Sequence, residues 1–201
     1  VCIHDVRALC AAEKLYGRAV GLSDFACLHV TDGIGGALVL DGKIYRGRDG
    51  SAGEFGHITA VPDGPLCGCG NRGCIEVMAS NRAVTDAISS RIGRKVSLEE
   101  AVAMCRAGNR TAVEVVNAAF DYIGIAIAAI INAVNPQAVF VCGRMLDAFE
   151  DPIRLLRERT DSRALPSAFR GCIIQRSSVD EVQGAAAAVM MRLLGIESVS
   201  Y

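Results

Sequence analysis

The sequence predicts an α/β fold in which three short strands come first and helices alternate with strands afterwards. Apolar runs of strand length fall at residues 25–30, 37–40 and 43–45, and Asp41-Gly42 is a hairpin turn signal between the last two. Beyond residue 75, apolar residues recur at helical spacing, interrupted by short apolar runs at 138–142 and 172–175. Hairpin strands followed by this alternation predict a layered α/β architecture.

The remaining elements follow from spacing and capping signals. Residues 5–16 have helical spacing and stop before Gly17. Residues 75–92 predict a helix broken near Ser80-Asn81, and Ser97 to Glu100 matches a capping box before a helix to residue 107. We further expect helices at 110–135, within 146–159 and at 182–194, the last rich in small residues at 184–188.

Composition limits the classes of protein that this chain can be. With 201 residues, 51% of them hydrophobic and 21% charged, it is long enough for one domain with a substantial core. A net charge of −1 gives no sign of a basic nucleic-acid or membrane surface. The nine cysteines are mostly isolated, which predicts free thiols in a reducing, cytoplasmic compartment. We expect no secretory leader and no membrane span. Because the sequence begins at Val1, we interpret the chain as a fragment.

One imidazole and three thiols lie close together in the sequence, at His57, Cys67, Cys69 and Cys74. Three Cys and one His form a complete tetrahedral ligand set for structural zinc, and thiolate and imidazole favour zinc over magnesium or calcium. Glycines between the cysteines allow a tight loop. The alternative is three unrelated buried cysteines and a loop histidine, which the Cys-x-Cys-x4-Cys spacing disfavours.

The same stretch carries a family resemblance. Gly53-Glu54-Phe55-Gly56-His57, followed by Cys67-x-Cys69-Gly70-x-x-Gly73-Cys74-x-Glu76, resembles the signature of the ROK family (repressors, open reading frames and sugar kinases). Further matches cover nearly all of the chain, namely the Asp5 segment, Gly33-x-Gly35-Gly36, Asn135-Pro136 and Gly184-Ala185-Ala186. The resemblance implies an actin/hexokinase-like, ribonuclease H-like fold.

The resemblance also implies which part of a ROK protein this chain is. Family members begin with a small lobe bearing an Asp-x-Gly-Gly-Thr phosphate loop, and the regulators add a winged-helix DNA-binding domain before it. Neither is found in these residues. Residues 1–201 therefore resemble the larger, C-terminal lobe of a ROK protein.

Site residues are carried over from the family position by position. The resemblance implies zinc on His57, Cys67, Cys69 and Cys74, and a sugar held near His4, Asp5, Glu54, His57 and Glu76. Alternatively, zinc only stabilises the fold and His57 contacts no sugar. Asp5 matches the family's catalytic base, although it is also a plausible helix cap. Gly33, Gly35 and Gly36 match the family's second phosphate turn.

Three departures from the kinase pattern lie on the nucleotide side. Asn-Asp in the kinases is His4-Asp5 here, as in some sugar-responsive repressors of the family. Asp32 places a carboxylate where the kinases present donors to phosphate, which costs on the order of a few kcal/mol in a partly dry site. Arg144 replaces the second residue of a Gly-Gly pair. The sugar side is intact, so the pattern favours a regulator.

The resemblance thus predicts the sugar-binding effector lobe of a ROK transcriptional regulator that responds to a hexose, amino sugar or sugar phosphate. DNA would be bound only through a winged helix outside this chain, and family members commonly form homodimers. The alternative is a glucokinase or N-acyl-hexosamine kinase that uses Asp5 and Mg-ATP, although this lobe alone would catalyse nothing. A third, weaker interpretation is a structural zinc lobe used for assembly.

Overall fold

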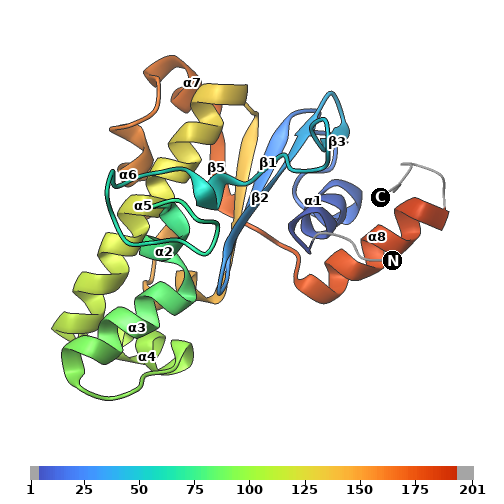
Figure 1. The fold of residues 1–201 in the computed structure, drawn as a ribbon. Helices are drawn as coiled ribbons and strands as arrows, with labels where there is room; N and C mark the ends of the chain where they lie inside the picture. The colour runs from blue at the N-terminus through green and yellow to red at the C-terminus, as the bar shows by residue number, and fades with distance from the viewer. Residues whose placement is uncertain (1–4, 194–201) are drawn as a thin grey trace.

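The computed structural model describes residues 5–193, which contain one five-stranded mixed sheet (Figure 1). The strands are β1 (Phe25–Val30), β2 (Ile34–Leu40), β3 (Lys43–Tyr45), β4 (Ala138–Cys142) and β5 (Ile173–Arg176), in the order β3-β2-β1-β4-β5. β1, β2 and β3 pair antiparallel, whereas β4 lies parallel to β1 and β5 parallel to β4. The carboxyl ends of β1, β4 and β5 therefore meet at one edge of the sheet.

Helices separate the strands of the parallel half. They are α1 (Asp5–Tyr16), α2 (Ile75–Ala79), α3 (Asn81–Ile92), α4 (Leu98–Arg106), α5 (Arg110–Val134), α6 (Pro152–Asp161), α7 (Pro166–Gly171) and α8 (Glu181–Leu193), with short 3₁₀ turns η1 (Phe55–His57) and η2 (Arg144–Ala148). Ser97 starts α4 by accepting a hydrogen bond from Glu100 N–H, and Asn135 ends α5 in the left-handed conformation.

Two layers of helix cover the sheet (Figure 1). On one face, Ala26, Leu28 and Val30 of β1 belong to the main core, to which α5 contributes more residues than any other element. On the opposite face, Phe25 and Cys27 pack with residues of α1, which is itself covered by α8. Because successive residues of a strand point to opposite faces, β1 is buried on both and reads as a continuous apolar run.

α5 is the only described helix long and apolar enough to cross a membrane by length and composition. In this fold 61% of its most apolar window is buried, and its apolar side chains form the centre of the main core. It is therefore a core helix.

The mixed α/β class is confirmed, but several predicted boundaries are wrong. The second strand starts at Ile34 instead of residue 37, because its ladder with β1 continues through His29↔Gly35 to Val30↔Ile34. Gly35 and Gly36 are thus strand residues, not a turn. The helical region after Gly143 is split into η2 and α6, and α7 was not predicted. Leu194, the predicted last residue of the final helix, lies outside the described residues.

Candidate functional site

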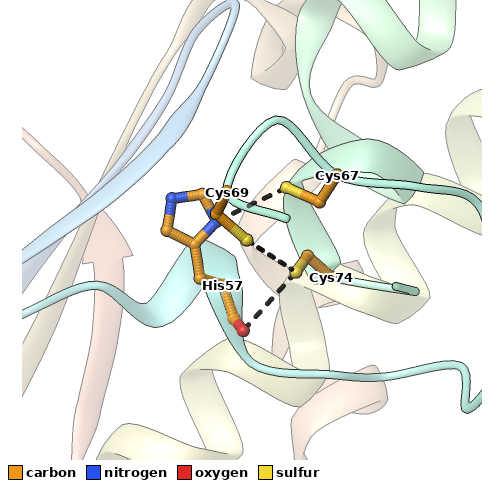
Figure 2. A group of neighbouring side chains, drawn as sticks. All are labelled: His57, Cys67, Cys69 and Cys74. Carbon is orange, nitrogen blue, oxygen red and sulfur yellow. Dashed lines mark hydrogen bonds between the residues drawn. The ribbon is translucent and has the colours of Figure 1, made fainter. Parts of the chain in front are cut away.

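The four residues of the Cys/His cluster come together in space (Figure 2). His57 ends η1, Cys67 and Cys69 lie in the following loop, and Cys74 is the residue before α2. Their candidate ligand atoms all lie within 4.8 Å of one another. Cys67 and Cys74 are buried, whereas Cys69 is exposed. The cluster joins the segment after the antiparallel strands to the helix that carries Glu76.

The loop reaches this shape through backbone contacts that glycine permits. Thr59 pairs with Cys74 and Leu66 with Arg72 in isolated antiparallel bridges, which fold residues 59–74 back on themselves. Gly73 has φ of +65°, and a Cβ there would lie 1.7 Å from Val61 O. No other residue type fits this position without moving the backbone, so the tight loop depends on glycine.

The distances between these atoms can be compared with those of a zinc site. Ligands at the usual distances, about 2.3 Å for sulfur and about 2.0 Å for nitrogen, place two sulfurs about 3.8 Å apart and a sulfur about 3.5 Å from a nitrogen at the tetrahedral angle. Cys69 Sγ lies 3.7 Å from Cys74 Sγ, and Cys67 Sγ lies 3.6 Å from His57 Nδ1. The donor set and these two distances fit a tetrahedral zinc ion with His57 Nδ1 as the nitrogen ligand, and the whole set lies within 4.8 Å.

The thiols differ in their electrostatic surroundings. Burial raises the pKa of the Cys74 thiol to about 12, whereas the backbone N–H of Asn71 lowers the pKa of the Cys69 thiol. A buried thiol with a raised pKa is protonated at neutral pH. A cation that binds it therefore displaces a proton, which couples metal binding to pH.

Glu76, on α2, lies against the turn between β1 and β2. Its Oε2 accepts a hydrogen bond of 3.0 Å from Ile34 N–H, and its Oε1 lies 4.0 Å from Cys67 Sγ. Gly33 makes this approach possible, because a Cβ there would lie only 2.9 Å from Glu76 Oε2. The carboxylate is therefore held between the Cys/His cluster and the glycine turn.

Glu54 lies on the other side of the histidine. It is the residue before η1, and its Oε2 lies 3.9 Å from His57 Nε2. With Nδ1 turned towards Cys67, the imidazole presents Nε2 on the side of Glu54. A metal on Nδ1 leaves the proton of a neutral imidazole on Nε2, which then acts as a hydrogen-bond donor beside a carboxylate acceptor.

The structure brings some of the predicted site residues together and leaves others undecided. His57 belongs to the Cys/His cluster, Glu54 lies next to His57, and Glu76 lies next to Cys67. Asp5 is the first residue of α1, and His4 lies outside the described residues. In β2, a Cβ at Gly36 would meet the Phe55 ring at 2.4 Å, so this glycine permits η1 to pack on the strand.

Sequence reasoning missed the contacts between the turn and the helices. Ile34 N–H binds Glu76, and Asn81 N–H donates to Thr31 O at 2.7 Å, so residues 31–34 are tied to both α2 and α3. The break at Ser80-Asn81 was predicted, but spacing alone does not show which turn the start of α3 meets. Long-range contacts of this kind require the tertiary structure.

Two of the residues that depart from the kinase pattern lie at the carboxyl edge of the parallel strands. Asp32 is exposed in the β1–β2 turn. Arg144 follows Gly143 at the end of β4, and its Nη1 is 2.7 Å from Glu99 Oε1 of α4. Gly143 itself must be glycine, since a Cβ there would lie 2.2 Å from Val30 O. The Arg144 side chain is thus turned towards α4.

The sequence profile of the ROK family matches residues 1–192. This chain belongs to the ROK family. Among curated proteins, the DNA-binding transcriptional dual regulator NagC of Escherichia coli is 30% identical over 186 residues, which cover 88% of this chain and 46% of NagC. The chain spans about half the length of the curated regulators it matches.

Two solved structures share the fold of this chain. A ROK family transcriptional regulator, homologous to the E. coli MLC protein, superposes with a TM-score of 0.84 at 30% identity, over 94% of this chain and 51% of that one. A ROK family glucokinase from Streptomyces griseus, in complex with glucose and AMPPNP, gives a TM-score of 0.85 at 27% identity, over 96% of this chain and 68% of that one. Similarity therefore extends to both regulators and kinases.

Proposed function

We propose that this chain is the sugar-binding effector lobe of a ROK transcriptional regulator, responsive to a hexose, an amino sugar or a sugar phosphate. The observation that carries the proposal is the position of two carboxylates beside one Cys/His cluster, Glu54 next to His57 and Glu76 next to Cys67. Fixed carboxylate acceptors beside an imidazole donor match the vicinal hydroxyls of a sugar. By the family resemblance, His4 and Asp5 would also contact the sugar.

Zinc on His57, Cys67, Cys69 and Cys74 would stabilise this arrangement. When bound, the ion supplies charge that keeps the thiols deprotonated and fixes the loop. The chain's own residues do the recognition. Glu76 Oε2 accepts from Ile34 N–H, and Oε1 accepts from the Cys67 thiol at 4.0 Å. A zinc-bound thiolate at Cys67 would no longer donate, which would leave Oε1 to accept from a sugar hydroxyl, and the imidazole Nε2 would donate beside Glu54.

A regulator couples this site to DNA through a conformational equilibrium. We propose that residues 1–201 form the larger lobe, with DNA binding supplied by a winged helix elsewhere in the polypeptide, and that the protein acts in the cytoplasm as a homodimer. A sugar shifts the equilibrium between two arrangements of the lobes only by its difference in affinity for them. Sedimentation equilibrium that finds a strict monomer would exclude the dimer.

Two observations at the nucleotide side favour a regulator over a kinase. Asp32 exposes a carboxylate in the turn that corresponds to the kinase phosphate turn, and a nucleotide phosphate would be repelled there. The charge of Arg144 is already paired with Glu99, so it is not available to bind a nucleotide phosphate. The kinase remains the second candidate, favoured by the likeness to a glucokinase solved with glucose and AMPPNP. In that case Asp5 would be the base, with Mg-ATP as the phosphoryl donor.

The test is a calorimetric titration of the complete natural protein with glucose and N-acetylglucosamine, alongside Glu54→Gln and Glu76→Gln variants. We expect binding by the wild type and at least roughly tenfold weaker binding by each variant, the scale of one hydrogen bond to a charged group. A coupled assay with ATP separates the two candidates. Turnover that vanishes in Asp5→Asn would establish the kinase and overturn the regulator proposal.

A further inference from the structure

Backbone hydrogen bonds and three glycines shape the loop before Glu54. Residues 46–53 connect β3 to η1, and Gly47, Gly50 and Gly53 all have positive φ, of 71°, 87° and 101°. A Cβ at Gly50 would meet no atom within 4 Å, so side chains do not enclose the middle of the loop. Ala52 N–H closes the loop on Arg46 O, and Gly36 N–H binds Gly53 O at its end.

Arg7 reaches this loop from the first turns of α1. Its Nη2 donates hydrogen bonds to Gly50 O and to Ala52 O, the latter at 3.4 Å. The side chain is half-buried, and its Nε is buried without a hydrogen-bond partner among the described residues. The guanidinium is thus enclosed between helix and loop, which is unlike a solvated surface arginine.

Arg7 therefore joins two parts of the chain that both lead to the site. α1 begins at Asp5, two residues before Arg7, and Glu54 follows the loop two residues after Ala52. We propose that Arg7 is a positioning residue for Glu54, fastening residues 50–52 to α1 so that the Glu54 carboxylate keeps its place beside His57. This assignment rests on the proposed sugar-binding function. Arg7 acts through the loop backbone and does not touch the sugar.

The planar guanidinium explains why arginine suits this role. Nη2 carries two N–H groups for the two loop carbonyls, and the planar guanidinium fixes the directions in which they point. A lysine could donate to a carbonyl, but from a flexible stem with a single charged centre. Arg7→Lys should therefore restore only part of what Arg7→Met removes.

The experiment compares wild type, Arg7→Met and Arg7→Lys in the complete natural protein, with Arg110→Met as control. Arg110 has a side chain 92% exposed and pairs with Glu114 one helical turn away, so its loss removes an equal charge far from any loop anchor. Hydrogen–deuterium exchange measures how often the backbone amides of residues 46–53 open to solvent. Titration with N-acetylglucosamine and glucose measures sugar affinity.

We expect Arg7→Met to speed exchange of residues 46–53 and to weaken sugar binding, each by roughly tenfold, with zinc content unchanged. Repeating Arg7→Met in a Glu54→Gln background should cost less than about threefold in affinity, because the two residues act on one contact. The assignment is overturned if Arg7→Met leaves the exchange rates of residues 46–53 unchanged. It is also overturned if the losses of sugar-binding free energy caused by Arg7→Met and Glu54→Gln add fully in the double variant. Absence of sugar binding by the wild type would instead overturn the proposed function. The hydrogen–deuterium exchange measurement would still test whether Arg7 anchors residues 46–53.

Discussion

Gly33→Ala tests whether the position of the Glu76 carboxylate decides sugar affinity. Gly33 does not have a positive φ, so alanine can adopt its backbone conformation. The added Cβ, however, would lie 2.9 Å from Glu76 Oε2, whereas ordinary contacts begin near 3.4 Å. The carboxylate must therefore move by about 0.5 Å, the difference of these two distances, while the fold has no reason to change.

The magnitude follows from two hydrogen bonds of the carboxylate, one to a sugar hydroxyl and one to the backbone. A sugar hydroxyl whose acceptor has moved loses a hydrogen bond to a charged group, about 1.5–3 kcal/mol, which corresponds to roughly ten- to a hundredfold in affinity. Within the protein, Ile34 N–H donates to the same Oε2 at 3.0 Å, and a shift of that size stretches this bond to the limit of useful geometry. Loss of the bond to Ile34 lowers stability, and the restriction of the unfolded chain by Gly→Ala, about 0.4–1 kcal/mol, offsets part of that loss.

Gly35→Ala is the matched control. It makes the same substitution two residues along the chain, but its Cβ would meet only the Val6 side chain, at ordinary distances of 3.6 Å and 3.9 Å. Calorimetric titration with N-acetylglucosamine and glucose, together with thermal unfolding, should find affinity lost in Gly33→Ala and kept in Gly35→Ala. Equal sugar affinities in wild type, Gly33→Ala and Gly35→Ala would show that Glu76 does not contact the sugar.

Three further predictions concern the metal loop and the core. Cys67→Ser should abolish stoichiometric zinc, measured by elemental analysis, because a hydroxyl is a far weaker zinc ligand than a thiolate. Zinc affinity should rise with pH, because the Cys74 thiol, with a pKa of about 12, is protonated before zinc binds. The protons released on binding can be measured by calorimetry as a difference in binding enthalpy between buffers of different ionisation enthalpy. Gly124→Ala should destabilise the fold by about 1–3 kcal/mol in denaturant titrations, since its Cβ would lie 2.7 Å from Arg159 Cβ where α5 and α6 pack.

Each of these has an outcome that contradicts it. Full zinc occupancy in Cys67→Ser would remove Cys67 from the ligand set. A zinc affinity that is the same at pH 6 and pH 8 would mean that the thiols are already ionised. Wild-type stability in Gly124→Ala would show that the α5–α6 contact adjusts without cost.

The sequence predicted the elements well where local chemistry decides them. Apolar runs identified β1, β3 and β4 with their observed bounds, and the Ser97 cap located the start of α4. The start of β2 was misplaced because glycine normally indicates a turn, whereas Gly35 and Gly36 here extend a ladder against β1 and make room for η1. α7 carries too few apolar residues for its spacing to be recognised.

The Cys/His cluster could be predicted because its residues are close in sequence and chemically unambiguous. The partners of Glu76 could not, since Ile34 lies 42 residues away and contributes only a backbone amide. The orientation of Arg144 also needed the structure, because its ion pair with Glu99 joins η2 to α4 across 45 residues. Backbone donors and long-range ion pairs have no local sequence signal.

The most direct measurement is the sugar affinity of the complete natural protein before and after removal of zinc by a chelator and after zinc is restored. We predict binding of N-acetylglucosamine or glucose by the zinc form, at least roughly tenfold weaker binding without zinc, and full recovery on readdition. Equal affinity in both forms, or no heat in either, would contradict a carbohydrate site organised by the metal loop.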